Sequence, residues 1–250
     1  MSGHSKWSSI KHKKGALDAK RGKLFTKLIR EITVAAREGG NNIESNARLR
    51  LAVQKGKDAN MPADNIERAI KKGTGELEGV SYENVSFEGY GTGGVAVIVA
   101  GLTDNRNRTT SEVRSIFAKR GGNMAGAGSV AFQFEKKGIF LVKTDDADEE
   151  ELMAVAIDSG ADDFTSDEDF FQITCPSQDF DKVRAGLLKR SVKIESGELS
   201  MIPNNTVRIE DVETARKILA LVEELEDNDD VQDVYSNFDI PDEILEEIED

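Results

Sequence analysis

Apolar side chains recur every three or four positions through the first 73 residues, a period typical of helices that bury one face. This pattern predicts a long helix over residues 17–38, which ends at the glycine pair Gly39-Gly40. It also predicts shorter helices over residues 45–58 and 62–73, because proline at position 62 suits a first helical turn and glycine at position 73 suits a helix end. We therefore expect a small three-helix domain in this part of the chain.

From residue 80 the apolar pattern becomes that of β-strands separated by helices. In chain order it predicts strands 80–88 and 94–102, helix 108–119, strands 129–135 and 138–143, helix 147–158, strands 161–164 and 169–175, helix 178–190, strands 193–201 and 206–209, helix 211–226 and strand 231–236. The six elements between residues 138 and 201 have the order βαββαβ, which is the ferredoxin-like or split-βαβ pattern. The elements on either side of them form the two halves of a second such unit.

These elements predict an α+β fold of three domains, in which one of two ferredoxin-like split-βαβ domains is inserted in the other. The first domain is a basic N-terminal arm and three-helix domain over residues 1–78. The second is a discontinuous α+β domain over residues 79–136 and 204–240. The third is the inserted ferredoxin-like α+β domain, over residues 137–203.

Charge is divided unevenly along the chain, whose formal net charge is −14. Residues 1–72 contain 17 Lys and Arg against 7 Asp and Glu, whereas the other 178 residues contain 16 basic and 40 acidic side chains. A solvated acidic surface accounts for the second part, but it does not account for the reversal of sign in the first. A basic segment attached to an acidic body is what the binding of a polyanion such as nucleic acid requires.

The basic residues of the first predicted helix share one face. On a helical wheel, the side opposite the apolar residues carries Lys20, Lys23, Lys27, Arg30 and Arg37. Such a face can also be merely solvated and paired with acids one helical turn away. The first 37 residues hold ten Lys and Arg but only Asp18 and Glu31 as acids, so local pairing neutralises little of this charge. We interpret the face as a surface that contacts phosphates.

A second basic segment, residues 104–110, connects a predicted core strand to a helix. Arg106 and Arg108 stand where the helix begins, and positive charge at that end opposes the helix dipole. Contact with an anion accounts for them, and the alternative is a polar turn in which either arginine pairs with a nearby acid. The candidate nucleic-acid-binding residues are Lys6, Lys11, Lys13, Lys14, Lys20, Arg21, Lys23, Lys27, Arg30, Arg106 and Arg108.

Two glycine-rich segments resemble nucleotide-binding loops without the required context. The run at residues 89–94 has the spacing of the dinucleotide fingerprint, but it leads into a strand instead of a helix and therefore predicts a hairpin turn. The run at residues 121–128 follows a helix, so it is either a helix cap with a connection or a mobile loop that contacts RNA or protein.

The sequence contains no catalytic or metal-binding pattern. The two histidines stand eight residues apart in the basic arm, and the single cysteine, Cys175, lies on an apolar strand. We expect no enzymatic activity, no metal and no cofactor. The longest apolar run, Val95–Ala100, is far shorter than the roughly 18 residues of a membrane span. Together with one cysteine and no secretory signal, this predicts a cytoplasmic protein without membrane contact, and we further expect a monomer.

Several short motifs along the whole chain resemble those of the YebC family. They include Gly3-His4-Ser5-Lys6-Trp7, Asp18-Ala19-Lys20-Arg21-Gly22-Lys23, Phe25-Thr26-Lys27, Asn60-Met61-Pro62, Glu88-Gly89-Tyr90-Gly91, Asp104-Asn105-Arg106-Asn107-Arg108-Thr109 and Gly121-Gly122-Asn123. The resemblance implies a cytoplasmic three-domain α+β protein around a central cavity, with no known catalysis.

The resemblance leaves two functions open. Family members are usually described as probable transcriptional regulators that bind DNA. Related members, including a mitochondrial activator of cytochrome c oxidase translation, act on ribosomes and relieve stalling, notably at proline-rich stretches. Because no short helix face concentrates base-reading side chains, ribosomal RNA suits the basic face at least as well as DNA. A third hypothesis is a small-molecule sensor, since tandem βαββαβ domains often hold ligands between them.

Overall fold

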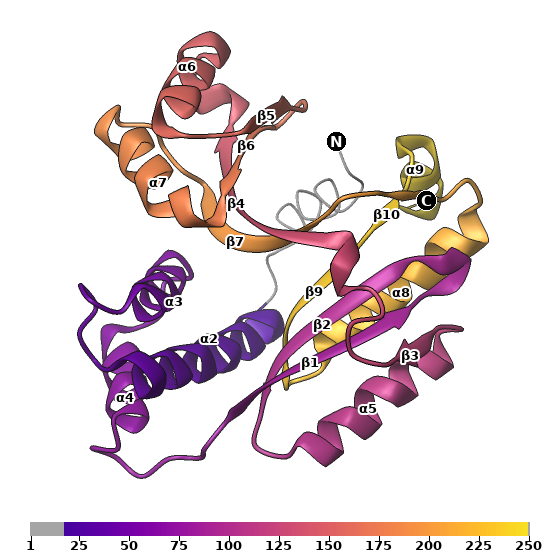
Figure 1. Ribbon diagram of the computed structural model, residues 1–250, viewed down its shortest axis with the longest axis horizontal. Helices are drawn as coiled ribbons and strands as arrows, with labels where there is room; N and C mark the ends of the chain where they lie inside the picture. Colours follow the sequence, from indigo (N-terminus) through magenta and orange to yellow (C-terminus); the bar gives the residue numbers. More distant parts are fainter. Residues whose placement is uncertain (1–17, 250) are drawn as a thin grey trace. The chain divides into compact units, whose positions relative to one another are not determined.

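The computed structural model describes the backbone of residues 18–249 and the side chains of residues 22–248. Among these residues the chain forms two compact units. One is Phe132–Thr206, and the other combines residues 18–131 with residues 207–249. The fold is α+β, with a three-helix domain and two ferredoxin-like domains, one inserted in the other, as the sequence predicts (Figure 1). The residue boundaries given above for the three domains stay predictions.

The three-helix domain has a core of its own. Its helices are α2 (Asp18–Gly39), α3 (Ala47–Asp58) and α4 (Ala63–Gly73). Their apolar faces meet in a cluster that includes Leu28, Ile32, Leu49 and Ile66. Each such side chain contributes about 1.5–3 kcal/mol when it is fully buried. Leu24, on the apolar side of α2, stays 46% exposed. The other apolar residues of that side contact the core, namely Phe25, Leu28, Ile29, Ile32 and Ala35.

The inserted domain, in the unit Phe132–Thr206, is a four-stranded antiparallel sheet in the order β5-β6-β4-β7. Its elements in chain order are β4 (Phe134–Lys143), α6 (Glu149–Ser159), β5 (Asp163–Ser166), β6 (Phe170–Pro176), α7 (Phe180–Lys189) and β7 (Ser196–Pro203). Helices α6 and α7 cover one face of the sheet (Figure 1). Phe140 of β4 stacks on Phe180 of α7 with ring centroids 4.6 Å apart. This arrangement confirms the complete βαββαβ series that the sequence predicts.

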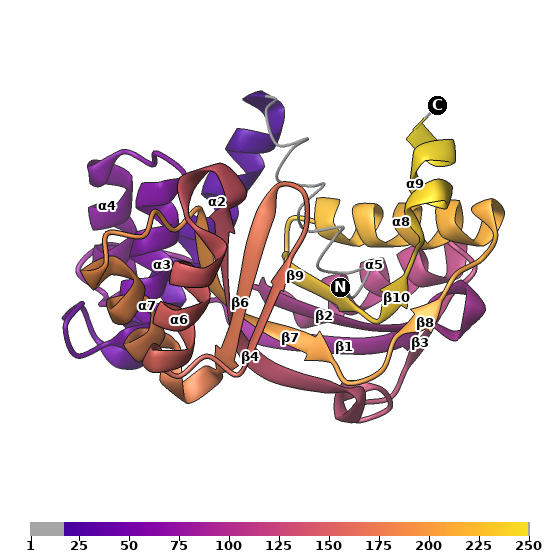
Figure 2. The same cartoon turned by 90° about the horizontal axis from the view of Figure 1, so that it is seen from above.

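The other unit contains a second four-stranded sheet, in the order β3-β1-β2-β9. Its elements are β1 (Glu83–Tyr90), β2 (Ala96–Thr103), α5 (Arg106–Lys119), β3 (Asn123–Ala125), α8 (Val212–Asp227) and β9 (Val231–Ser236). Helices α5 and α8 lie on the same face of this sheet (Figure 2). All its strand pairs are antiparallel, and the strand order is that of a ferredoxin-like sheet.

The segments that supply the strands of this second sheet differ from those expected from the sequence. We expected residues 206–209 to supply one of the four strands of this sheet, but β1 is the fourth strand instead, between β2 and β3. A hairpin such as β1–β2 closes a short loop, which costs less entropy than a pairing across the inserted domain. Residues 206–209 instead contribute only β8 (Val207–Arg208), which pairs in parallel with β10 (Phe238–Asp239).

The predicted strand over residues 129–135 is also wrong. Val130 and Ala131 donate their backbone N–H groups to the carboxylate of Glu88, so these groups cannot join a strand ladder. β4 begins only at Phe134. The hairpin predicted at residues 89–94 is confirmed, with Gly93 and Gly94 at positive φ, where glycine is favoured.

The remaining elements are short. They are the 3₁₀ helices η1 (Thr92–Gly94), η2 (Ala131–Gln133), η3 (Thr144–Asp146) and η4 (Ser177–Asp179), and the helix α9 (Asp242–Glu249), which the sequence analysis did not predict. Of the helices that the structure describes, none is long and apolar enough to cross a membrane.

Candidate nucleic-acid interface

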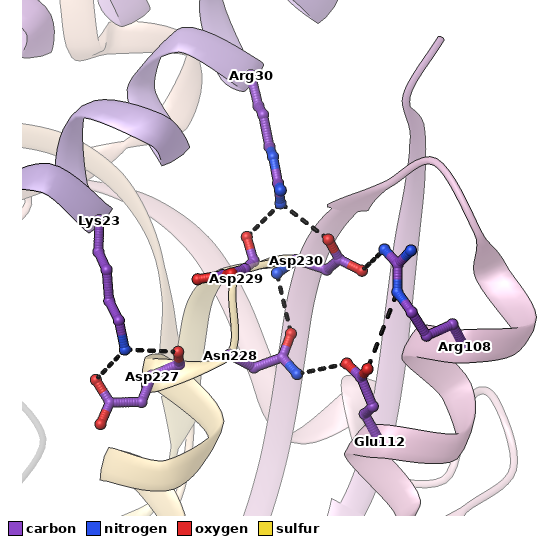
Figure 3. A pocket seen from close by; sticks show the side chains of 8 residues that line it. All are labelled: Lys23, Arg30, Arg108, Glu112, Asp227, Asn228, Asp229 and Asp230. Atoms are coloured by element: carbon purple, nitrogen blue, oxygen red, sulfur yellow. Dashed lines mark hydrogen bonds and ion pairs between the residues drawn. The ribbon is translucent and has the colours of Figure 1, made fainter. Parts of the chain in front are cut away.

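The basic face of α2 contacts a run of acidic residues that lies about 200 residues further along the chain. This run, residues 226–230, joins the end of α8 to β9, and we call it the acidic turn. Lys23 Nζ lies 3.3 Å from the carbonyl oxygen and 3.5 Å from the carboxylate of Asp227. Lys27 Nζ donates to the carbonyl oxygen of Glu226 at 2.6 Å. Figure 3 shows Lys23 and Arg30 reaching this turn from the same helix.

Asp230 is the centre of these contacts. Its carboxylate accepts a hydrogen bond from Arg30 Nη1 at 2.9 Å and from Arg108 Nη2 at 2.6 Å (Figure 3). The hydroxyls of Thr103 and Thr109 donate to it at 3.0 and 2.6 Å. Its side chain is only 4% exposed. Burial by itself raises the pKa of Asp230, but the donors outweigh it and the pKa is lowered, so the carboxylate stays ionised.

The two arginines at the start of α5 differ in their surroundings. Arg108 pairs with Asp104 at 2.9 Å as well as with Asp230, so it has both a local and a distant acid. Hydrogen bonds to Asp230 and Asp104 raise the pKa of Arg108 above its ordinary value. Arg106 is exposed, with its Nη1 3.6 Å from Glu83 Oε2. The structure therefore brings Arg30 and Arg108 together at Asp230 and leaves Arg106 outside that cluster.

Several candidate residues lie outside the description. Lys6, Lys11, Lys13 and Lys14 precede the described residues, and so does the aromatic Trp7. The side chains of Lys20 and Arg21, in the first turn of α2, are likewise outside it. Their role in binding nucleic acid stays a prediction, as does that of Lys23, Lys27, Arg30, Arg106 and Arg108.

A polar pocket of about 430 Å³ lies among these contacts. Its lining consists of Lys23, Arg30, Arg108, Glu112, Asp227, Asn228, Asp229 and Asp230 (Figure 3). Because four of these side chains are acids and three are bases, the pocket does not attract an anion in this arrangement. Within the described part of the chain, no cluster of three His, Cys, Asp or Glu side chains is placed to hold a metal ion.

Asp227 and Asp230 belong to this charged cluster, although neither is among the candidate residues that the sequence predicts. A signal was present, because acids at the carboxyl end of a helix face the negative end of its dipole and need a cation from elsewhere. The last turn of α8 contains no basic residue. Lys23 and Lys27 of α2 supply that positive charge across the fold.

Glu88 binds the end of the second glycine-rich segment, residues 121–128, and the residues just after it. The Glu88 carboxylate accepts backbone N–H groups from Gly128 and Val130 at 2.7 Å and from Ala131 at 2.9 Å. Burial raises the pKa of Glu88, but these backbone donors outweigh it and lower the pKa. Within the segment, β3 pairs with β1. The amides that could cradle a phosphate here already bind a carboxylate of the protein itself.

Two models of known protein families match this chain. A family model described as the TACO1/YebC protein N-terminal domain matches residues 5–76, and one described as the TACO1/YebC second and third domain matches residues 82–238.

Curated relatives match over nearly their whole length. A protein of Syntrophobacter fumaroxidans is 57% identical over 99% of this chain and 100% of its own, and one of Persephonella marina is 57% identical with the same coverage. Both are named "Probable transcriptional regulatory protein". The crystal structure of a conserved hypothetical protein from Aquifex aeolicus superposes with a TM-score of 0.84 at 53% identity, and covers 91% of this chain and 94% of that one.

Proposed function

Since the chain belongs to the TACO1/YebC family, we propose that it is a non-enzymatic regulatory protein that binds nucleic acid in the cytoplasm. The names of its relatives support a regulator of transcription, and therefore DNA as the partner. Binding would use mainly phosphate contacts, since the basic residues lie along a helix face and on the arm before it.

The observation that carries this proposal is the segregation of charge. Residues 1–72 have ten more basic than acidic side chains, while the rest of the chain has 24 more acidic than basic ones. On α2 the basic side chains Lys23, Lys27 and Arg30 lie on one side, and Leu28 and Ile32 are buried on the other. A cationic helix on an acidic body is drawn to a polyanion while the body limits non-specific adsorption.

Ribosomal RNA is the second candidate partner, for a factor that binds the ribosome and relieves stalling at proline-rich stretches. The sequence of the three-helix domain favours it, because Asn, Gln and Arg do not gather on one short helix face as they do on a base-reading helix. RNA is recognised largely by shape and by phosphate and sugar contacts, for which a cationic face is sufficient.

Cross-linking in growing cells tests the proposal and separates the two partners. The tagged protein is cross-linked, purified under denaturing conditions, and the attached nucleic acid is sequenced. Enrichment of chromosomal DNA at defined promoters supports the transcriptional regulator, and enrichment of ribosomal RNA supports the ribosomal factor. A variant with Lys20, Lys23 and Lys27 changed to Gln is the control. Equal recovery from wild type and this variant, without enrichment of either class, contradicts the proposal.

A further inference from the structure

We propose that the acidic turn, residues 226–230, competes with nucleic acid for the basic face of α2. Binding then requires α2 to leave the turn, so the free protein is held in a self-inhibited state. The inference rests on the proposed function, and it adds an intramolecular competitor for the phosphates.

The contacts of α2 with the acidic turn resemble those that it would make with a phosphate backbone. Lys23 and Lys27 donate to main-chain and carboxylate oxygens of Asp227 and Glu226, and Arg30 donates to Asp230 and to the carbonyl of Asp229. Phosphates offer anionic oxygens to Lys and Arg in the same way as the carboxylates of Asp227 and Asp230 do. Because the same ammonium and guanidinium groups would serve both partners, and the acids of the turn repel phosphates, binding to one opposes binding to the other.

The association of α2 with the turn is polar, with one buried ion pair, Arg30–Asp230, and an exposed one, Lys23–Asp227. All eight residues that line the pocket at this contact are polar or charged, unlike the apolar interior of a permanent interface. The Lys23 and Asp227 side chains are 50% and 62% exposed, so salt and solvent weaken their pairing. The core of the three-helix domain is formed by α2, α3 and α4 alone. If the three helices move away from the turn together, this core stays buried.

The connection to the sheet also allows movement. Residues 74–82, between α4 and β1, contain neither helix nor strand, and most of their side chains are exposed. Gly75 in this segment has a positive φ. Two contacts of Arg37, with Ser81 and with the carbonyl of Tyr82, hold the segment against α2. Arg30 of α2 also lies over the Tyr82 ring, 5.3 Å from its centroid, so this exposed linker is held mainly by α2 itself at its far end and can change direction when α2 moves.

The charge of the turn has no local explanation. Acids at the carboxyl end of α8 oppose its dipole and repel each other, so they destabilise the turn unless cations cover them. Asp227 and Asp229 are both exposed, and neither is needed to fill a core. The charge of Asp227 pairs with Lys23 of α2, and the charges of both acids are available to repel nucleic acid from the same surface.

The test uses the full chain with Asp227→Asn and Asp229→Asn together, which removes two charges and leaves the buried Asp230 in place. The probes are a short fluorescein-labelled DNA duplex and an RNA hairpin with the same number of phosphates, at low salt. The matched control is Glu246→Gln with Glu247→Gln, which changes the net charge equally. The backbone carbonyl of Glu247 accepts a hydrogen bond from Arg216. Arg216 precedes Asp227 by eleven residues on α8, which is about 16 Å along the helix, so the control pair lies away from the acidic turn.

Binding should tighten about five-fold or more for the Asp227 and Asp229 variant, the scale of a typical coupling between sites, and stay near wild type for the control. Equal tightening of both variants is a general charge effect and overturns the inference, and so does no change in either. If wild type and both variants all fail to bind either probe, the proposed function itself is wrong and the inference falls with it.

A second measurement follows α2 directly. Dyes are attached at Ser45→Cys and Ser111→Cys, both exposed positions, while the buried Cys175, whose pKa burial raises to about 11, resists labelling. Addition of the DNA or RNA probe should change the energy transfer between the dyes. Unchanged transfer at saturating probe means that α2 binds without leaving the turn, and contradicts the inference.

Discussion

The carboxylate of Asp230 receives hydrogen bonds from Arg30, Arg108, Thr103 and Thr109, which come from three different elements. Moving a carboxylate out of water costs several kcal/mol, and only well-placed donors offset that cost. Here two cationic and two hydroxyl donors surround the carboxylate. Asp230 thus joins the acidic turn to α5 and, in the free protein, to α2.

Removal of this carboxylate should be strongly destabilising. We expect Asp230→Ala to lower the free energy of unfolding by about 3–5 kcal/mol, because two arginines and two hydroxyls lose their acceptor. The exposed neighbour serves as the control, and Asp229→Ala should change the same quantity by about 0.5 kcal/mol or less. Urea denaturation measures both. Equal midpoints for the two variants would mean that the Asp230 contacts do not stabilise the fold.

The pKa shifts of Glu88 and Asp230 predict a loss of stability in acid. Both pKa values are lower in the folded protein than in the unfolded chain, where ordinary values are about 4. The ionised carboxylates therefore stabilise the fold above about pH 4, and this contribution is lost as the pH falls through the lowered folded-state values. Glu88→Gln has no carboxylate to protonate, so its unfolding free energy should fall less between neutral and acid pH. Parallel pH profiles for wild type and variant contradict this assignment.

At the scale of the element, local pattern was sufficient wherever an element buries a face close by in the chain. The helices α2, α3 and α4 and the complete βαββαβ series of the inserted domain follow from periodicity and from their caps. Asn46, for example, caps α3 by accepting the N–H of Leu49, as its residue type favours.

The sequence could not predict which strand neighbours which across the insertion. Residues 206–209 and 83–90 both have strand character, and nothing local decides that β1 takes the central place. The strand expected over 129–135 was lost to the carboxylate of Glu88, about 40 residues away. Both errors come from contacts between residues far apart in the chain, which a local pattern does not contain.

Two glycines of the three-helix domain give a matched test of its packing. A Cβ at Gly73 would lie 2.3 Å from the carbonyl oxygen of Thr33, so Gly73→Ala should force α4 away from α2 and cost about 1–3 kcal/mol. At Gly56, inside α3, the nearest atom is 3.5 Å away on Ile66, which is ordinary contact. Gly56→Ala should therefore stabilise by about 0.5–1 kcal/mol. Thermal unfolding measures both, and a shift of the same sign in the two variants refutes this packing.

At the scale of the whole molecule, a count of nearby acids misjudges the basic face. Lys23, Lys27 and Arg30 lie together on one side of α2, as the helical wheel predicts. Nearby acids were too few to neutralise their charge, but the acidic turn supplies partners from about 200 residues away. Charge on a helix face is thus readable from sequence, whereas its pairing depends on the fold.

If nucleic acid binds through phosphate contacts on α2, its affinity depends on salt through the lysines of that helix. Equilibrium binding of a DNA duplex is measured over a range of salt concentrations for wild type and for Lys20, Lys23 and Lys27 changed to Gln. The control has the same change of net charge, at Lys182, Lys189 and Lys193 of the inserted domain. The account predicts that the slope of log K against log salt becomes shallower by about 2.7 for the α2 variant, at about 0.9 per phosphate, and stays at the wild-type value for the control. Equal slopes for wild type and the α2 variant would contradict it.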